Sequence, residues 1–214
     1  MHNQHSNKRL NAFFALSLGV LAIAPASAVV TVGQIDDFQD GTTQGWTNTA
    51  SMTNPPINQA NTGPTGLGDN VLFSAVGGSP DTFSIVNSSQ WAGDYVAAGI
   101  TTITLDINNL GPNNLSLGIL LNGGAAGTTS VSVPSGSGWV TRSIDLSTLL
   151  FGSPTNLSAV SSIELVSLQG GAVTSVGALD VYVDNIRAVP EPSTALLACV
   201  ALTTAGLLRR RRNS

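Results

Sequence analysis

The chain has 214 residues, of which 42% are hydrophobic and only 9% charged, and its formal net charge is −4. Within residues 29–188, Arg142 and Arg187 are the only basic residues against eleven carboxylates, and the resulting net charge of −9 repels phosphate backbones and excludes nucleic-acid binding. The same piece has no His, Cys or Lys, which excludes disulfides, zinc sites built on nitrogen or sulfur, Cys nucleophiles, Ser-His-Asp triads, Schiff-base lysines and P-loops.

Residues 1–28 have the pattern of a secretory signal peptide. Lys8 and Arg9 form a basic region, residues 11–24 are apolar, and Ala28 ends a small-residue cleavage pattern, Ala-Ser-Ala. We therefore expect export through the Sec translocon and removal of the leader by signal peptidase. The mature chain is expected to start at Val29.

Residues 29–188 are long enough for one domain with a sizeable core, and their pattern predicts β-structure. Residues 101–108 alternate strictly, with Ile103, Leu105 and Ile107 on one face. Asp106 and Asn108 lie on the other face, where a jelly roll would place polar groups that bind a ligand; alternatively, this face is simply hydrated. Further strands are expected at 71–76, 82–86, 115–121, 128–133, 139–146, 162–168 and 179–186, with a long loop at 54–70.

These strands, separated by turns rich in Gly, Pro, Asn and Ser, predict an all-β fold. No sustained helical period appears between residues 29 and 188. We therefore expect an antiparallel two-sheet β-sandwich of the jelly-roll type, with no internal repeat and no linker. A signal helix before it and a short transmembrane helix after it complete the expected organisation.

Residues 189–214 form a tail with three parts. Pro190 and Pro192 break the chain, residues 194–208 are apolar, and an arginine cluster follows. Fifteen residues make a helix of about 22 Å, short of the ~30 Å hydrocarbon core, so the predicted membrane anchor is marginal. A core helix is the alternative, but no face of the segment carries a charge. The positive-inside rule places the cluster in the cytoplasm; its members are Arg209, Arg210, Arg211 and Arg212.

The order Pro190-Glu191-Pro192, apolar helix and arginine cluster resembles the PEP-CTERM sorting tail of Gram-negative bacteria. This resemblance implies recognition by an exosortase, a membrane protease-transpeptidase that removes the helix near the Pro-Glu-Pro site. The protein would then be anchored in the inner membrane transiently and would end at the cell surface or outside the cell.

The two ends of the domain carry a second resemblance. The opening IDDFQDGTTQGW and the closing LDVYVDNI resemble the first and last strands of galactose-binding-like jelly rolls, which include many carbohydrate-binding modules. In that family the terminal strands often hold a structural calcium ion, and the matching positions here are Asp37, Gln39 and Asp184. The usual residue at Gln39 is Glu, so a neutral oxygen replaces a negative one and weaker calcium binding is implied. Alternatively, the carboxylates are solvated turn residues.

Aromatic residues are the candidates for a sugar-binding surface, because an apolar ring face matches the C–H face of a pyranose. Trp91 and Tyr95 lie in the polar stretch QWAGDY and are expected to be exposed, and Trp139 is a further candidate beside Asp106 and Asn108. Packing in the core is the alternative for each aromatic residue.

The sequence thus predicts a non-catalytic module whose candidate ligand is extracellular polysaccharide. Two alternatives remain open. One is a purely structural matrix protein without a defined ligand, and the other is a carboxylate-dependent glycosidase using Glu164, the only glutamate of the domain. A single small sandwich offers no second domain to form a deep cleft, which argues against hydrolysis.

Overall fold

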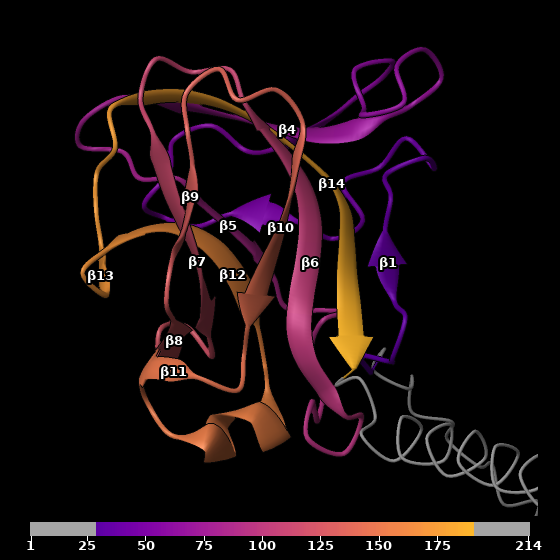
Figure 1. The fold of residues 1–214 in the computed structure, drawn as a ribbon, viewed down its shortest axis with the longest axis vertical. Helices are drawn as coiled ribbons and strands as arrows, with labels where there is room; N and C mark the ends of the chain where they lie inside the picture. Colours follow the sequence, from indigo (N-terminus) through magenta and orange to yellow (C-terminus); the bar gives the residue numbers. More distant parts are fainter. Residues whose placement is uncertain (1–28, 191–214) are drawn as a thin grey trace, which may run out of the picture.

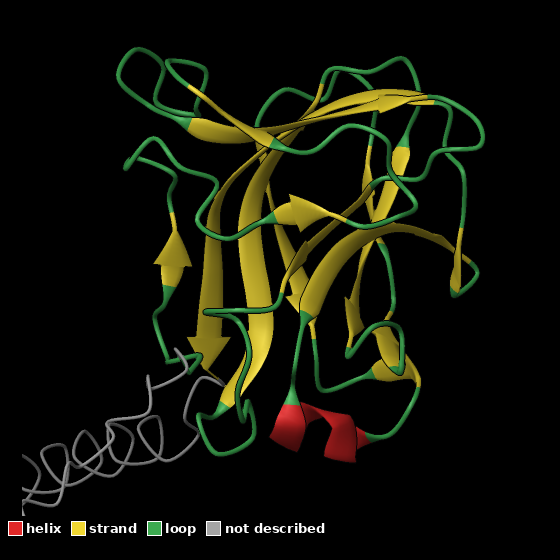
Figure 2. Cartoon of the chain, turned by 180° about the vertical axis from the view of Figure 1, so that it is seen from behind, coloured by secondary structure: helices red, strands yellow, loops and turns green. Residues whose placement is uncertain are grey.

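The computed structural model describes residues 29–190, and these form two antiparallel β-sheets packed face to face (Figures 1 and 2). The helical element seen in Figure 2 is a short 3-10 turn, η1 (Pro154–Ala159). The all-β sandwich predicted from the alternating pattern is therefore confirmed. The predicted leader at 1–28 and most of the sorting tail, from Glu191 to the arginine cluster, lie outside the described residues.

One sheet, here called the front sheet, consists of six strands. They are β1 (Ile35–Asp36), β3 (Ile57–Gln59), β4 (Val71–Gly77), β6 (Ile100–Asn109), β10 (Val140–Asp145) and β14 (Ala178–Pro190). The strand order is β10-β6-β14-β4-β3, and β1 also pairs with β14.

The back sheet has eight strands. They are β2 (Thr47–Asn48), β5 (Ser84–Asn87), β7 (Leu115–Leu121), β8 (Ala126–Thr128), β9 (Val131–Val133), β11 (Leu149–Phe151), β12 (Ile163–Gln169) and β13 (Ala172–Val173). The order is β11-β8-β7-β12-β5-β2, with β13 paired to β12 and β9 paired to β7.

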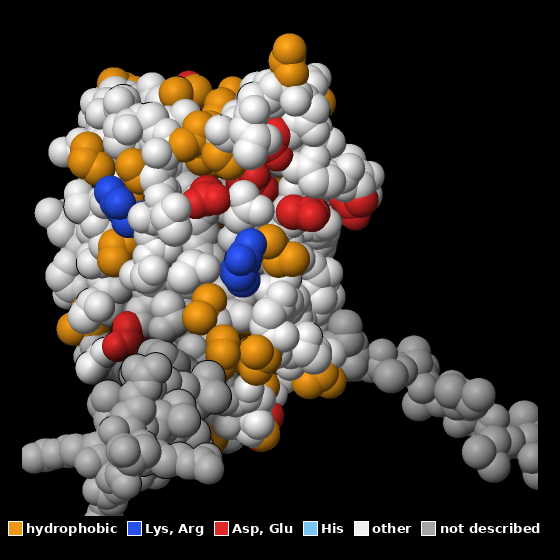
Figure 3. Space-filling view, turned by 45° about the vertical axis from the view of Figure 1, so that its right-hand side comes forward, with side chains coloured by type: hydrophobic (Ala, Val, Ile, Leu, Met, Phe, Trp, Pro, Cys, Tyr) orange, Lys and Arg blue, Asp and Glu red, His pale blue; other side chains and the backbone are white. Residues whose placement is uncertain are grey.

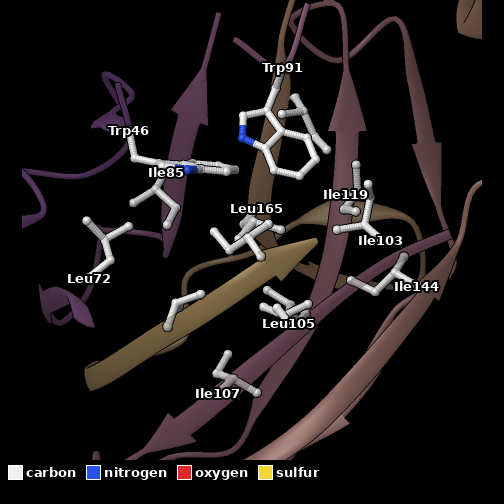
Figure 4. Close-up of a cluster of buried hydrophobic side chains, with 14 of the residues drawn as sticks. Trp46, Leu72, Ile85, Trp91, Ile103, Leu105, Ile107, Ile119, Ile144 and Leu165 are labelled. Carbon is white, nitrogen blue, oxygen red and sulfur yellow. The ribbon is translucent and has the colours of Figure 1, made fainter. Parts of the chain in front are cut away.

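The core lies between the two sheets and follows the period-2 pattern of the strands. On β6, Ile103, Leu105 and Ile107 are buried against the back sheet, as the alternation predicts (Figure 4). Facing residues of the back sheet, such as Ile119 and Leu165, fill the space opposite them. Thr102, Thr104 and Asp106, which alternate with these residues, consequently point to the outer face of the front sheet.

Two predicted segments differ from the structure. Residues 54–70 were expected to form a loop, but β3 lies within them and pairs with β4. Residues 128–133 were expected to form one strand, but β8 and β9 pair separately with different parts of β7. In both cases the deciding factor is pairing with the edge of the strand that comes next or just before in the chain, and this pairing overrides local composition.

Strand β14 organises the front sheet. One of its edges pairs with β6, while its other edge pairs first with β4 and then with β1. The change of partner occurs at Asp184, where the register with β6 shifts and Asn185 adopts a left-handed conformation with φ of 50°. This irregularity brings the segment after β1 next to Asp184.

The first described residues and the last ones lie at the same end of the sandwich (Figure 1). The N–H of Gly33 donates to the carbonyl of Ala188, and the N–H of Ala188 donates to the carbonyl of Gln34, both at 3.0 Å. Strand β14 continues to Pro190, two residues past the predicted domain boundary at 188. Within residues 29–190 no helix is long and apolar enough to cross a membrane.

Candidate functional site

The outer face of the front sheet carries three aromatic side chains in one row across its strands. Tyr182 of β14 is the register partner of Phe73 on β4 and of Asn108 on β6, and Trp139 precedes β10. The Phe73 and Tyr182 rings meet edge to face at 5.2 Å, and the Trp139 and Tyr182 rings lie nearly parallel at 6.3 Å. All three rings are partly exposed, so together they form an apolar platform.

Asn108 lies in the same row, between the strands that carry Trp139 and Tyr182. Its side chain is 8% exposed, and its Oδ1 is the one buried side-chain polar atom within residues 29–190 that has no hydrogen-bond partner. A buried acceptor without a donor costs roughly 1–3 kcal/mol, so such atoms are uncommon without a function. The amide oxygen is thus an unpaired acceptor in the row of aromatic rings.

Polar side chains surround the platform, although most of them already have partners. The Asp106 carboxylate accepts hydrogen bonds from Thr141 Oγ1 at 2.6 Å and from Asn185 Nδ2 at 3.0 Å. The Gln59 Nε2 donates to the Tyr182 hydroxyl at 3.0 Å, which orients the ring. Figure 3 shows hydrophobic side chains on the upper part of the molecular surface, with acidic side chains close by.

The structure places the predicted site residues in two different environments. Asp106, Asn108 and Trp139 come together on the outer face of the front sheet. Trp91 and Tyr95 do not join them, because both are 0% exposed and belong to the core. Figure 4 shows the Trp91 ring among the buried side chains. The expectation that these two residues are exposed is wrong.

A buried carboxylate explains why a polar stretch of sequence contributes aromatic rings to the core. Asp36 Oδ2 accepts the indole N–H of Trp91 at 2.6 Å and that of Trp46 at 2.7 Å, and Gln90 Nε2 donates to Asp36 Oδ1 at 2.7 Å. The Tyr95 hydroxyl donates to the carbonyl of Trp91 at 2.9 Å. The polar atoms of these rings therefore find partners inside the sandwich. Burial raises the pKa of Asp36, and the three donors partly offset this effect.

The predicted metal ligands lie near one another at the change of partner on β14. Asp184 is 0% exposed, and its carboxylate accepts hydrogen bonds only from the backbone and side chain of Asn185. Burial, together with the neighbouring carboxylates of Asp69, Asp106 and Asp37, raises its pKa to about 7 against the lowering effect of the Asn185 N–H. No cation among residues 29–190 forms a salt bridge with this carboxylate.

The oxygen atoms around Gln39 test whether calcium fits here. The Gln39 Nε2 donates to the carbonyl of Asp37 at 3.0 Å, to Asp69 Oδ1 at 2.7 Å and to the carbonyl of Asn70 at 3.3 Å. Calcium binds six to eight oxygens and accepts carbonyl groups, so the donor chemistry fits. However, within the described part of the chain no three acidic, His or Cys side chains converge into a metal site. An ion would therefore need backbone carbonyls and a reversed Gln39 amide that presents Oε1.

Glu164 lies on β12 of the back sheet, far in topology from the aromatic row. Its Oε1 accepts a hydrogen bond from Ser84 Oγ at 2.5 Å, and burial raises its pKa. The register partners of Glu164 are Val86 and Leu120, neither of which is ionisable. Within residues 29–190, neither strand that flanks Glu164 places a second carboxylate opposite it to form an acid and base pair.

Sequence reasoning missed two members of the row, Phe73 and Tyr182. The signal was the strand parity: Leu72, Ser74 and Val76 point inward on β4, so Phe73 points outward. On β14, Val181 and Val183 point inward, so Tyr182 points outward. The alternation of residues along each strand therefore shows that Phe73 and Tyr182 face outward. It does not show which strands lie side by side.

The end of the chain matches a known family model. Residues 188–212 carry the PEP-CTERM protein-sorting motif. The match begins at Ala188, so the first three residues of the sorting motif are also the last three residues of β14. No curated protein matches the sequence.

Several solved structures resemble the sandwich. An exo-β-agarase matches with a TM-score of 0.52 and 16% identity. The match covers 76% of this chain but only 26% of the agarase chain, so this chain corresponds to about a quarter of that protein. The family 11 carbohydrate-binding module of a cellulase from Clostridium thermocellum matches with a TM-score of 0.46 and 18% identity. The match covers 75% of this chain and 96% of that module's chain. A carbohydrate-binding module specific for non-crystalline cellulose matches with a TM-score of 0.49 and 16% identity. The match covers 76% of this chain and 97% of that module's chain. At these identities the likeness concerns the fold alone.

Proposed function

We propose that the protein is exported, processed by an exosortase at its sorting motif, and acts at the cell surface or outside the cell. There it serves as a non-catalytic module that binds polysaccharide through the outer face of the front sheet. The processing part of the proposal is supported by the sorting motif at 188–212, and the export part by the leader pattern at 1–28. The Sec translocon and signal peptidase are the expected partners before the exosortase acts.

The observation that carries the binding proposal is the row formed by Trp139, Asn108, Tyr182 and Phe73. Sugar rings have apolar C–H faces and hydroxyl edges, so a surface that recognises them combines aromatic rings with a few oriented polar groups. The platform supplies the rings, and the unpaired Asn108 Oδ1 supplies an acceptor for a hydroxyl. A purely structural matrix protein would not need an exposed platform with a buried acceptor left unpaired.

Charge favours a neutral polysaccharide. The piece 29–188 has a net charge of −9, and Asp106 and Asp180 lie on the strands that carry the row. Polymers of uronic acids or sulfated sugars would be repelled by these carboxylates. A neutral glycan avoids this cost, and its hydroxyls are donors that suit carboxylate and amide acceptors.

Binding is a better account of the site than hydrolysis. Glycoside hydrolysis needs two carboxyl groups that flank the scissile bond. Asp184 is fully buried and does not reach the surface, Asp106 is held by Thr141 and Asn185, and Glu164 lies on the other sheet. The arrangement supports recognition without a reaction.

A calcium ion between β14 and the segment after β1 is also proposed, with Asp184, Gln39 and Asp37 as the residues that would hold it. The support is the buried Asp184 carboxylate without a cationic partner in the described residues, and the oxygen-rich surroundings of Gln39. Its role would be structural, because the ion would join the two ends of the domain.

The test of binding is a glycan array probed with the mature protein, followed by affinity measurement on the polymers that bind. We expect Trp139→Ala and Asn108→Ala to weaken binding, by about tenfold to a hundredfold for Trp139→Ala, since truncating an aromatic residue that stacks on the ligand costs roughly 1.4–2.8 kcal/mol. Leu67→Ala is the matched control, because Leu67 is 93% exposed at a loop tip outside the row. Absence of binding to every glycan, or equal binding by the parent and Trp139→Ala, would overturn the proposal.

A further inference from the structure

The sorting motif has no linker before it. Ala188, Val189 and Pro190 are the first residues of the motif match, and all three belong to β14. Val189 is the register partner of Thr102, and Pro190 is the register partner of Ile100 on the same neighbouring strand, β6. Pro190 also lines an apolar hollow with Ile100 and Leu157, so it lies against the domain.

The distance from the sheet to the predicted processing site is correspondingly short. Only Glu191 separates Pro190 from Pro192, and an extended residue spans about 3.3 Å, so Pro192 lies within roughly 7 Å of the last paired residue. A protease must reach both sides of the peptide bond that it cuts, and residues held in a sheet become available when the strand opens locally. The folded domain therefore obstructs the enzyme that releases it.

We propose that Val189 and Pro190 must leave β14 before the exosortase acts, so that local opening of this strand end controls the rate of processing. This inference rests on the proposed exosortase processing. It assigns the end of β14 two roles, which are an edge of the folded sandwich and part of the segment that the processing enzyme binds.

The contacts of the strand end define how far it opens. Val189 and Pro190 pair only with β6, and Pro190 has no N–H to donate to the ladder. Ala188 is different, because it is 1% exposed and exchanges two hydrogen bonds with Gly33 and Gln34 in addition to its pairing with β6. Opening thus stops at Ala188, and the rest of β14 stays in the sheet.

A disulfide across the strand end tests the inference in the full chain. Thr102 and Val189 are opposite each other in register, a relation that suits a disulfide between neighbouring strands, so Thr102→Cys and Val189→Cys would lock the end of β14 onto β6. The background carries Cys199→Ser, which removes the only native thiol. The matched control is Ala75→Cys with Asp180→Cys, which locks the beginning of β14 onto β4 and leaves its end free.

The measurement is the rate at which exported chains lose the arginine cluster, followed by pulse-chase and intact mass in cells with an active exosortase. We expect the Thr102–Val189 lock to slow processing at least tenfold, dithiothreitol to restore it, and the control lock to behave like the parent. A six-residue Gly-Ser spacer between Val189 and Pro190, about 20 Å when extended, leaves Pro190-Glu191-Pro192 intact and is expected to restore processing of the locked chain without reduction.

The outcomes distinguish the opening of β14 from the proposed exosortase processing on which it rests. Unprocessed parent protein in exosortase-positive cells would refute the proposed sorting. Normal processing of the Thr102–Val189 lock would refute the opening of β14 while leaving the sorting intact. A locked chain that stays unprocessed even with the spacer would also refute it, because the disulfide would then act on something other than access.

Discussion

Asp36 shows at the scale of one residue how a carboxylate organises the core. It accepts the indole N–H groups of Trp46 and Trp91, whose rings lie 6.2 Å apart and tilted by 53°. The chain thus buries two large rings from distant segments around one acceptor. Without the carboxylate, both indole donors would be buried unpaired, which is far costlier than losing a hydrogen bond at the surface.

We expect Asp36→Leu to lower the free energy of unfolding by roughly 2–6 kcal/mol, because two buried donors lose their acceptor at about 1–3 kcal/mol each. Asp36→Asn should cost less, since its amide oxygen still accepts one indole N–H. Denaturant titration measures both, with Asp180→Asn as a control at an exposed carboxylate. Equal stability of Asp36→Leu and the control would show that the indole groups find other partners.

Glu164 gives a prediction about pH. Burial raises its pKa above 4.5, so the folded state favours the protonated form. Its contribution to stability is therefore present below about pH 4.5 and is lost as the pH rises through the raised pKa. We expect Glu164→Gln to melt at a temperature that falls less between pH 4 and pH 8 than that of the parent. An equal change of melting temperature with pH in the two proteins would contradict this.

The same variant tests the glycosidase alternative. Release of reducing sugar by the parent, abolished in Glu164→Gln, would establish it.

At the scale of elements, β14 connects the beginning of the domain to its end. Its partner changes from β4 to β1 at Asp184, and Gln39 bonds to Asp69 and Asn70 just before β4. Three segments distant in sequence therefore meet at one place. An ion bound there would stabilise the folded state, since the unfolded chain does not hold these oxygens together.

The calcium prediction concerns this junction. Saturation at a hundred times the dissociation constant would add about 2.7 kcal/mol, which raises the melting temperature by roughly 5–10 °C and is reversed by EGTA. Asp184→Asn should abolish this rise in melting temperature, while Asp180→Asn on the same strand should keep it.

Gln39→Glu should strengthen calcium binding by restoring a charged ligand, and should destabilise the metal-free protein by removing the Nε2 donor. A melting temperature that calcium does not change, in either the parent or Gln39→Glu, would contradict the calcium site. The hydrogen bonds of the Gln39 side chain would then be what joins these segments.

At the scale of the whole molecule, the fold separates the proposed binding face from the end where the chain continues. Tyr182 and Pro190 are eight residues apart on β14, or roughly 26 Å along a strand. The row of aromatic rings therefore lies well away from the end that the tail would hold at a membrane. A domain that is still anchored would keep this face accessible to a polymer outside the cell.

The positions of the long strands and the excluded chemistry were determined by the sequence alone. Period-2 alternation identified β6 and its buried residues Ile103, Leu105 and Ile107, because solvent on one side and core on the other impose that period on any half-buried strand. The absence of His, Cys and Lys from residues 29–188 excluded whole classes of site without reference to any fold. The sorting motif was recognisable because its signal is local and contiguous.

Only the tertiary structure decided which aromatic residues face solvent. Trp91 and Trp139 both lie in polar stretches, yet Trp91 is buried, because a carboxylate 55 positions earlier accepts its indole N–H, while Trp139 lies on an uncovered face. The row itself depends on register across β4, β6 and β14, and these strands are far apart in the chain. Burial of a large amphipathic ring depends on a partner that local sequence does not contain, and strand neighbours are chosen by long-range pairing. For these physical reasons composition and periodicity predicted the long strands but not the site.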